Sequence, residues 1–540
     1  MMSDGFFKNV GIDSIGFYTP QFYLDLDDLA INRKIDPKKF RDGLLLHEMR
    51  IPDPNEDCVT MSVKAAQNAL IRGQVDPKTI DAIFVGTETI TYAVKSVSNI
   101  LADILGVSPN SITQDIYNAC AGATLAILNA IAMIENGIIN KALVIGVDIS
   151  SYDMHSPGEP TQGAGAVALI LTKNPRIAAF SHKFGKVSGN VNDFYRAAGQ
   201  KNAKVFGKYS VDSYLNFQMA AFDDLNKHIG EIQADYYAFH APFSKLPVKF
   251  VQKLIVERSQ HFVNYILNSN PKPPRSRLTS KLPSIRYSLK HFPSLISKIL
   301  LQNGYSRSVI DTVLQKASHY REHFFPHLNV PMHFGNMYSA SVWAQINYIL
   351  ENHSHSNDVI YFGSYGSGAT CISGLLKVMP KFDSVLKNYP KVEDYIQNKV
   401  RRTYEEYELI KMGRFHTTLS YGQIIPHEIN NNRGIELHYC DEGCLIASHE
   451  GLNRCPQGHS GNHKIFYPLY ALLTTDPIEN YDFTDTTPLF QGNVRILGKP
   501  KKGMLLEYDM RRVQIKIKDH ANAEGLLNWV PTYVPNSHTY

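Results

Sequence analysis

Four side chains with reactive groups stand where the sequence changes from one expected element to the next: Glu88, Cys120, His240 and Asn336. Cys120 begins a helix and is followed by three small residues, which leave room above its sulfur. The N-terminus of a helix carries partial positive charge and free N–H groups, so it favours a thiolate and lowers the pKa of a thiol. We therefore predict that Cys120 is a nucleophile rather than a small core residue.

The other three groups each have an ordinary structural explanation as well. A carboxylate after a buried strand is often a cap or an ion-pair partner, and a histidine there is often a hydrogen-bonded structural group. An asparagine at the start of a helix often caps it. Reactants in open α/β sheets gather outside the ends of strands and helices, however, so the four groups can converge on one site.

Short apolar strands alternate with helices along the chain. The helix at residues 119–135 is apolar all round, which indicates burial, and its apolar run is too short to span a membrane. A similar order of elements follows, with a helix that opens near Asn336, which suggests a duplicated unit. Residues 21–80 are expected to be mainly helical, and 363–368 to form a loop. The alternation of short apolar strands with helices predicts an α/β sheet covered on both faces. The expected strands are at 9–17, 81–88, 142–148, 163–171, 236–240 and 358–362.

Composition narrows the class of protein. The chain has 540 residues and a net charge of +5 with dispersed basic residues, which gives little support to nucleic-acid binding. Its N-terminus lacks the pattern of a secretory signal, and six cysteines do not make a disulfide framework in so long a chain. We expect a cytoplasmic protein with no membrane segment.

Several longer motifs together resemble hydroxymethylglutaryl-CoA synthase. They occur in that family's order across about residues 8–410. The matching segments are Gly86–Ile90 with Lys95–Ser98, Asn118–Thr124, Pro160–Val167, Asp193–Tyr195, Phe239–Lys245, Gly335–Ser339 and Ser364–Gly368. The resemblance implies the thiolase fold, in which two similar α/β halves form five layers, and a homodimer.

The resemblance also implies a reaction. Cys120 would take the acetyl group from acetyl-CoA, Glu88 would remove a proton from the acetyl methyl group, and His240 would polarise the ketone of acetoacetyl-CoA. Backbone N–H groups at Cys120 and in the 363–368 segment would serve as oxyanion donors. Water would then release the product, which feeds isoprenoid synthesis through the mevalonate pathway, with no cofactor required.

Further residues acquire expected roles from the matching motifs alone. Asn336 and Ser367 would contact the acyl group and thioester, and Asp148, Tyr152 and Asp193 would orient the nucleophile side of the site. The CoA arm or its phosphates would contact Thr161, Ser210, Lys245 and Lys249, although paired lysines are often simply solvated.

Three departures from the family accompany the resemblance. Ala121 replaces a tyrosine that directly follows the nucleophile in the animal enzymes and many bacterial ones, which leaves the acyl acceptor less certain. The loop at Ser156–Glu159 is one residue longer than the animal pattern. The chain also extends beyond most bacterial relatives. We therefore divide it into an N-terminal half at 1–175, a C-terminal half at 176–412 with a surface insertion at about 270–320, and a β-rich extension at 413–540.

The extension contains a cluster of potential metal ligands. Cys440, Cys444, Cys455 and His459 could hold structural zinc with three thiolates and one imidazole, while unliganded thiols and surface histidines are the alternative.

Two other functions remain open from sequence. The same catalytic set could install a β-branch on an acyl chain held by an acyl carrier protein, with the basic residues around 270–290 facing that acidic partner. A non-catalytic thiolase-fold scaffold is the third hypothesis, and the intact Glu88, Cys120 and His240 argue against it.

Overall fold

A computed structural model describes residues 7–412 of the chain except 54–55, 93, 198–199, 201, 269–291 and 388–389. Beyond residue 412 it describes only short strands, namely β16 (Gln423–Pro426), β17 (Glu436–Cys440), β18 (Leu445–Ser448), β19 (His463–Phe466), β20 (Pro468–Leu473), β21 (Arg495–Ile496), β22 (Val513–Asp519) and β23 (Ala523–Trp529).

The first half of the body contributes five strands in the order β1-β7-β6-β4-β5. Strand β4 runs parallel to β5 and β6, while β7 runs antiparallel to β6 and β1. Four of these strands, all but β5, are buried along most of their length, as expected for apolar strands covered on both faces. Their bounds are β1 (Phe7–Tyr18), β4 (Ala82–Gly86), β5 (Ile112–Ile116), β6 (Lys141–Ile149) and β7 (Ala164–Lys173).

The second half of the body contributes five more strands. They follow the order β12-β13-β14-β8, and β9 also pairs with β14. Because β1 pairs with β8 as well as with β7, the two sets join in one ten-stranded sheet. The bounds are β8 (Ala178–Ser181), β9 (Gly185–Ser188), β12 (Tyr236–Phe239), β13 (Val359–Gly366) and β14 (Thr370–Val378). Strand β13 thus continues through most of the expected 363–368 loop, because it forms a hairpin with β14.

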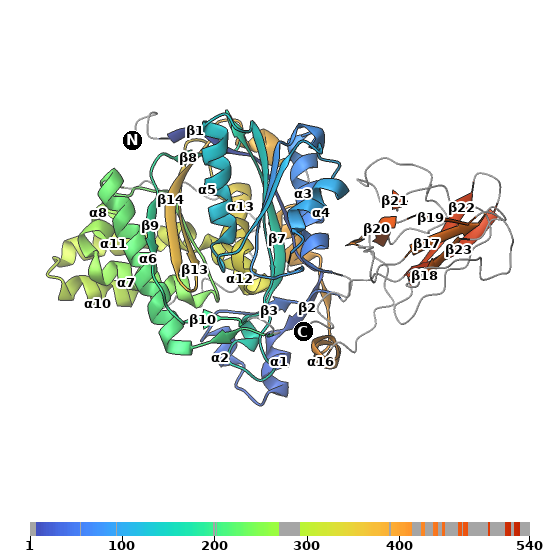
Figure 1. The fold of residues 1–540 in the computed structure, drawn as a ribbon. Coiled ribbons are helices and arrows are strands. Elements are labelled where there is room, and N and C mark those ends of the chain that lie inside the picture. The colour runs from blue at the N-terminus through green and yellow to red at the C-terminus, as the bar shows by residue number, and fades with distance from the viewer. Residues whose placement is uncertain are drawn as a thin grey trace.

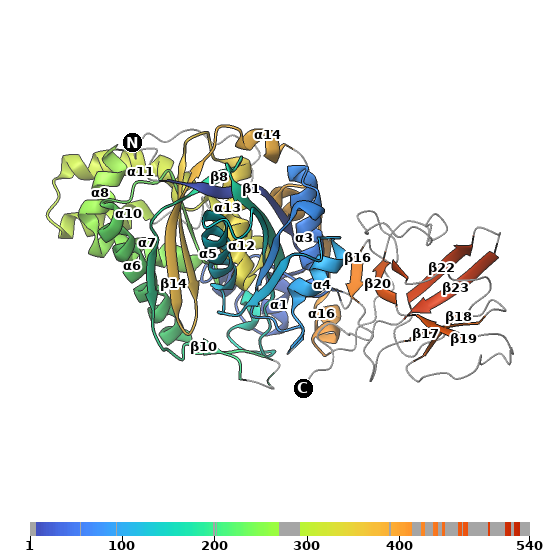
Figure 2. The same ribbon diagram turned by 45° about the horizontal axis from the view of Figure 1, so that its top comes forward.

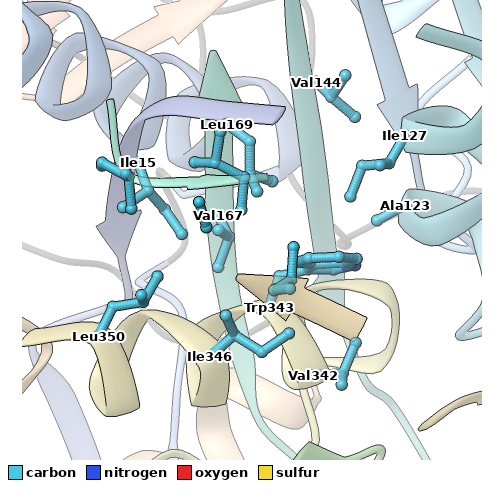
Figure 3. Close-up of a cluster of buried hydrophobic side chains, with 14 of the residues drawn as sticks. Ile15, Ala123, Ile127, Val144, Val167, Leu169, Val342, Trp343, Ile346 and Leu350 are labelled. Carbon is cyan, nitrogen blue, oxygen red and sulfur yellow. The ribbon is translucent and has the colours of Figure 1, made fainter. Parts of the chain in front are cut away.

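Two buried helices lie between the two sets of strands, α5 (Gly122–Glu135) and α13 (Ser341–Asn352) (Figure 1). Both belong to one cluster of apolar side chains that also includes residues of β1, β6, β7, β13 and β14. Figure 3 shows Trp343 and Ile346 of α13 facing Val167 of β7, with Ala123 of α5 close by. The Trp343 indole also donates a hydrogen bond to the Thr124 hydroxyl, at 3.0 Å, which ties the two helices together.

Outer helices complete five layers. Helices α3 (Cys58–Gly73) and α4 (Val97–Ile104) pack on the outer face of the first set of strands. The second set is covered by a larger group of helices (Figure 2), namely α6 (Gly207–Ile229), α7 (Lys245–Glu257), α8 (Ser259–Asn268), α10 (Phe292–Gln302) and α11 (Arg307–Phe324). Apolar residues of α10 and α11 are buried in this layer, so residues 292–324 belong to the body rather than to a surface insertion. The expected thiolase-like architecture is confirmed.

Residues 21–80 are less helical than the sequence suggested. Besides α3 they contain α1 (Leu26–Asn32), α2 (Lys38–Arg41) and two strands, β2 (Phe22–Asp25) and β3 (Glu48–Arg50). Strand β2 pairs with β3 on one side and with β15 (Val400–Arg401), from the end of the body, on the other. The last helix of the body, α16 (Tyr404–Lys411), begins at a Thr403 capping box with Glu406. The expected strand at 81–88 ends at Gly86, and Glu88 follows it.

The described strands of the C-terminal extension form three small sheets apart from the body's sheet, which agrees with a β-rich appendage. Cys444, Cys455 and His459 lie outside the described residues, and only the backbone of Cys440 is described, at the end of β17. Where the structure describes side chains, no group of three or more His, Cys, Asp or Glu residues is arranged to hold a metal ion. In the part of the chain that the structure describes, no helix is long and apolar enough to cross a membrane.

Candidate active site

Helix α5 begins at Gly122 with Ala121 as its N-cap, so Cys120 lies in the turn just before the helix rather than in the first turn, where the sequence predicted it. It is 5% exposed, and Ala119 before it adopts a left-handed backbone with φ of 43°. The backbone of β4 lies directly against this turn. A Cβ added at Gly86 would lie 2.1 Å from the Ala123 nitrogen, which is too close for any side chain. Strand β13 approaches from the other half, since a Cβ on Gly366 would lie 2.8 Å from the Ala121 nitrogen. Only glycine permits these two contacts, which bring both halves to the sulfur.

The pKa of the Cys120 thiol moves opposite to our prediction. Burial raises the pKa of Cys120 well above its ordinary value, and the nearby carboxyls of Glu88, Asp148 and Asp193 raise it further. The start of a helix favours a thiolate, but desolvation and three negative charges outweigh that contribution. The prediction of a lowered thiol pKa is therefore wrong for the free protein, and the thiol must lose its proton as it reacts.

Glu88 follows β4 and is held by the carboxylate of Asp148, which lies in β6. One Asp148 oxygen accepts hydrogen bonds from the Glu88 backbone N–H at 2.8 Å and from the hydroxyls of Thr87 and Thr89 at 2.9 and 2.8 Å. The other oxygen accepts two from Ser339 of the second half. A fully buried carboxylate with so many donors is a fixed anchor for the loop that carries Glu88.

The side chain of Glu88 suits a proton-transfer group. Burial raises the pKa of Glu88 well above its ordinary value, the charge of Asp148 raises it further, and Arg196 opposes both. Its Oε1 is buried without a hydrogen-bond partner in the described part of the chain. A carboxyl with a raised pKa is a stronger base once ionised, and this one is not occupied by a structural partner.

His240 follows β12 and is anchored by its backbone. Its N–H donates to the Gly363 carbonyl at 2.8 Å, and its own carbonyl accepts from the Tyr214 hydroxyl at 2.7 Å. Both ring nitrogens are buried and have no partner among the described residues. Burial lowers the pKa of His240 to about 3, so its imidazole is uncharged near pH 7 and offers one N–H donor. Because Gly363 and Gly366 share β13, this strand connects His240 to the Cys120 turn.

Asn336 lies between α12 (Asn329–Phe334) and α13. Its backbone N–H donates to the Thr161 carbonyl at 3.0 Å, and its side-chain oxygen accepts from the Tyr338 backbone N–H at 2.9 Å. Tyr338 has a φ of 42° and is buried, and the charges of Glu88 and Cys120 help to raise its pKa. Burial raises the pKa of Tyr152, and the same two charges raise it further, so both phenols lie within electrostatic reach of Cys120.

Asp193 is buried beside Tyr365 of β13. Its carboxylate accepts from the Tyr365 hydroxyl at 2.7 Å and from the Gly368 N–H at 3.1 Å. Burial raises the pKa of Tyr365, and the hydrogen bond and charge of Asp193 raise it further. The charge of Asp193 also adds to the effect of burial on the pKa of Cys120. No role was expected for Tyr338, Ser339 or Tyr365, although each lies inside one of the motifs that resemble the family.

The predicted CoA-binding residues are more dispersed. Thr161 is buried in the 3₁₀ turn Glu159–Thr161, next to Asn336. Ser367 is half-buried after β13, and Ser210 is half-buried in the first turn of α6. Lys245 donates to the Asp42 carbonyl at 2.7 Å, while Lys249 is exposed on α7. Among the residues that the structure describes, no hydrogen bond joins Ser210, Lys245 or Lys249 to the Cys120 turn.

Two family models match the chain in succession. The first, described as the N-terminal part of hydroxymethylglutaryl-coenzyme A synthase, matches residues 6–175, and the second, described as the C-terminal part, matches residues 187–421. The chain belongs to the hydroxymethylglutaryl-CoA synthase family. The boundary between the two family models falls between β7 and β9, where the two sets of strands meet.

Relatives carry the same family name. A hydroxymethylglutaryl-CoA synthase of Enterococcus faecalis is 33% identical over 253 residues, which cover 46% of this chain and 66% of that protein. One of Methanopyrus kandleri is 26% identical over 75% of this chain and 97% of that protein. Among solved structures, MvaS in complex with 3-hydroxy-3-methylglutaryl coenzyme A matches with a TM-score of 0.63 and 26% identity, over 79% of this chain and 98% of that one. As a member of this family, the chain is an enzyme of the acyltransferase type.

Proposed function

We propose that this enzyme condenses acetyl-CoA with acetoacetyl-CoA to 3-hydroxy-3-methylglutaryl-CoA. The observation that carries the proposal is Cys120 at the start of α5, close enough to Glu88 for that carboxyl to raise the pKa of the thiol. A thiol nucleophile beside a carboxyl with a raised pKa matches a two-stage acyl transfer and carbon–carbon bond formation.

The first stage is acetylation. The Cys120 sulfur attacks the thioester carbonyl of acetyl-CoA, the carbon–sulfur bond to CoA breaks, and the thiol proton leaves with CoA as its own thiol. We assign the Cys120 N–H, which precedes the first turn of α5, as a donor to the oxyanion. Because the thiol is protonated at rest, it gives up its proton during attack rather than before it.

The second stage forms the new bond. Ionised Glu88 takes a proton from the methyl group of acetyl-Cys120, and the resulting carbanion attacks the ketone carbon of acetoacetyl-CoA. The uncharged imidazole of His240 donates a hydrogen bond to the ketone oxygen as that oxygen becomes an alkoxide, and the proton that Glu88 took from the methyl group then passes to this oxygen, which returns Glu88 to its ionised form. Water finally hydrolyses the thioester to Cys120, which frees the thiol. Asn336 and Ser367 are the groups that we place against the acyl chain.

The proposal is tested by incubating the full chain with acetyl-CoA and locating the adduct by mass spectrometry of its peptides. We expect an acetyl group on Cys120, followed by its conversion to product when acetoacetyl-CoA is added. Conversion only with an acetoacetyl group on an acyl carrier protein would instead show a β-branching synthase. The absence of any adduct on Cys120 would contradict both readings.

We also propose that the enzyme is a cytoplasmic homodimer that needs no metal or redox cofactor for its reaction. Light scattering would test the dimer and cell fractionation the compartment. Activity after exhaustive treatment with a chelator would test the independence from metal. We retain structural zinc at Cys440, Cys444, Cys455 and His459 as a separate proposal, to be checked by elemental analysis of the purified chain.

A further inference from the structure

Helix α16 is the last helix of the body, and it contacts the segment 151–162 that carries Tyr152 and Thr161. The ammonium group of Lys411 donates to three acceptors of this segment, the Ser151 hydroxyl at 2.9 Å, the Tyr152 carbonyl at 3.1 Å and the Gln162 side-chain oxygen at 2.8 Å. One charged group therefore binds both ends of the segment.

Tyr407, one turn earlier in α16, makes a second set of contacts with the same segment. Its hydroxyl donates to Glu159 at 3.0 Å and accepts from the Gln162 amide at 2.9 Å. The ring is 2% exposed and lies in the small apolar cluster formed with α1 and the β2–β3 strands. Its position is thus fixed by packing, which makes the hydroxyl a rigid partner.

Arg33, the residue directly after α1, fixes the opposite side of Glu159. It donates through Nε at 3.0 Å and through a terminal nitrogen at 2.6 Å, and it also pairs with Glu408 of α16 at 2.8 Å. The side chains of Arg33 and Glu159 are 3% and 2% exposed, so this two-point ion pair is shielded from water.

The segment connects these contacts to the active site. Gln162 accepts from the Tyr152 backbone N–H at 3.0 Å and pairs through its backbone with Asn336. The Asn336 N–H donates to the Thr161 carbonyl at 3.0 Å. A displacement of Gln162 would therefore move Tyr152, Thr161 and Asn336 together.

We propose that Tyr407 and Lys411 are positioning residues that hold segment 151–162 in the conformation that binds acyl-CoA. This inference rests on the proposed function, because it takes the ligand of the segment to be acetyl-CoA. Without these contacts the segment spends part of its time out of position, and the apparent affinity falls by the fraction of protein that remains competent. Bound acyl-CoA draws the segment back, so the rate at saturation changes little.

The test compares Lys411→Met and Tyr407→Phe in the full chain, with Glu405→Gln as the control on an exposed position of the same helix. We measure KM and kcat for acetylation of Cys120, the Kd of CoA by calorimetry, and the melting temperature. Both variants should raise KM for acetyl-CoA and the Kd of CoA about tenfold, with kcat within about twofold. The control should match the wild type.

A merely structural role has a different signature. Loss of folded protein would lower the apparent kcat in proportion and leave KM unchanged, and that result would overturn the proposal. If Lys411→Met fails to fold, Tyr407→Phe decides, because it removes one oxygen and keeps the packed ring. A wild type that binds CoA but forms no adduct would refute the proposed function alone, since the Kd ratios still test the positioning role. A wild type that binds no CoA would refute both.

Discussion

Asp148 and Ser339 are 191 residues apart in sequence and share two hydrogen bonds in the active site. The Ser339 hydroxyl donates to one Asp148 oxygen at 2.6 Å and the Ser339 N–H donates to the same oxygen at 2.9 Å. Since Asp148 also accepts from the Glu88 backbone, this pair joins the second half of the body to the loop that carries Glu88.

Ser339→Ala removes the hydroxyl from this pair and leaves a buried carboxylate with one donor fewer. We expect a loss of about 1–3 kcal/mol in stability and a fall of about tenfold or more in condensation rate, because Glu88 becomes less well positioned. Thermal melts and steady-state kinetics would show both effects. Ser384→Ala, at an exposed serine that bonds only its own turn, is the control. Unchanged kinetics in Ser339→Ala would show that the pair is irrelevant to catalysis.

Gly366→Ala should disrupt the turn that presents Cys120. The added Cβ would lie 2.7 Å from the Asn118 carbonyl and 2.9 Å from the Ala121 Cβ, so the turn or β13 must shift. A shift of about 1 Å at a nucleophile can cost about 100-fold in rate, and we expect a loss of that order in acetylation. Stopped-time mass spectrometry of the Cys120 peptide measures it. Ser384→Ala, at the exposed serine of the preceding prediction, is again the control. Acetylation of Gly366→Ala at the rate of the control would refute this reading of the contact.

Acid should destabilise the protein partly through His327. Burial lowers the pKa of His327 to about 3, below the ordinary value of 6.5, and its ring is fully buried. The unfolded chain therefore binds this proton more readily, so stability is lost as pH falls from about 6.5 towards 3, by up to about 1.4 kcal/mol per pH unit.

His327→Leu should flatten that dependence. The variant should lose less melting temperature between pH 7 and pH 5 than the wild type does. His228→Leu, at an exposed histidine of α6, should follow the wild type. A His327 variant with the same acid sensitivity as the wild type would show that this ring does not contribute.

The parts of the fold that sequence could predict are those in which local pattern and burial agree. Helix α5 and strands β4, β6 and β7 are nearly continuous apolar segments, so their type and burial follow from the residues alone. The end of β13 was missed because its glycines resemble a loop, whereas a long-range hairpin with β14 extends the strand. Helices α10 and α11 were assigned to an insertion because the segment before them is rich in proline and basic residues.

The electrostatics of the site could not be predicted from sequence. The helix start at Cys120 is a local feature and favours a low thiol pKa. The opposing charges come from Glu88, Asp148 and Asp193, which are brought together only by the packing of β4, β6 and the segment before β10 (Phe194–Tyr195). Likewise, nothing local to Tyr407 or Lys411 indicates that they bind a segment about 250 residues earlier in the chain.

Cys120 and Glu88 are proposed to act in separate stages of the reaction, and the Glu88→Ala variant distinguishes these two stages. The variant is incubated with acetyl-CoA, the Cys120 peptide is examined by mass spectrometry, and acetoacetyl-CoA is then added. We expect an acetyl adduct on Cys120 that persists, with condensation reduced by at least about 100-fold, because only the second stage needs the base. Loss of the adduct together with condensation, or condensation at the wild-type rate, would contradict separate roles for Cys120 and Glu88.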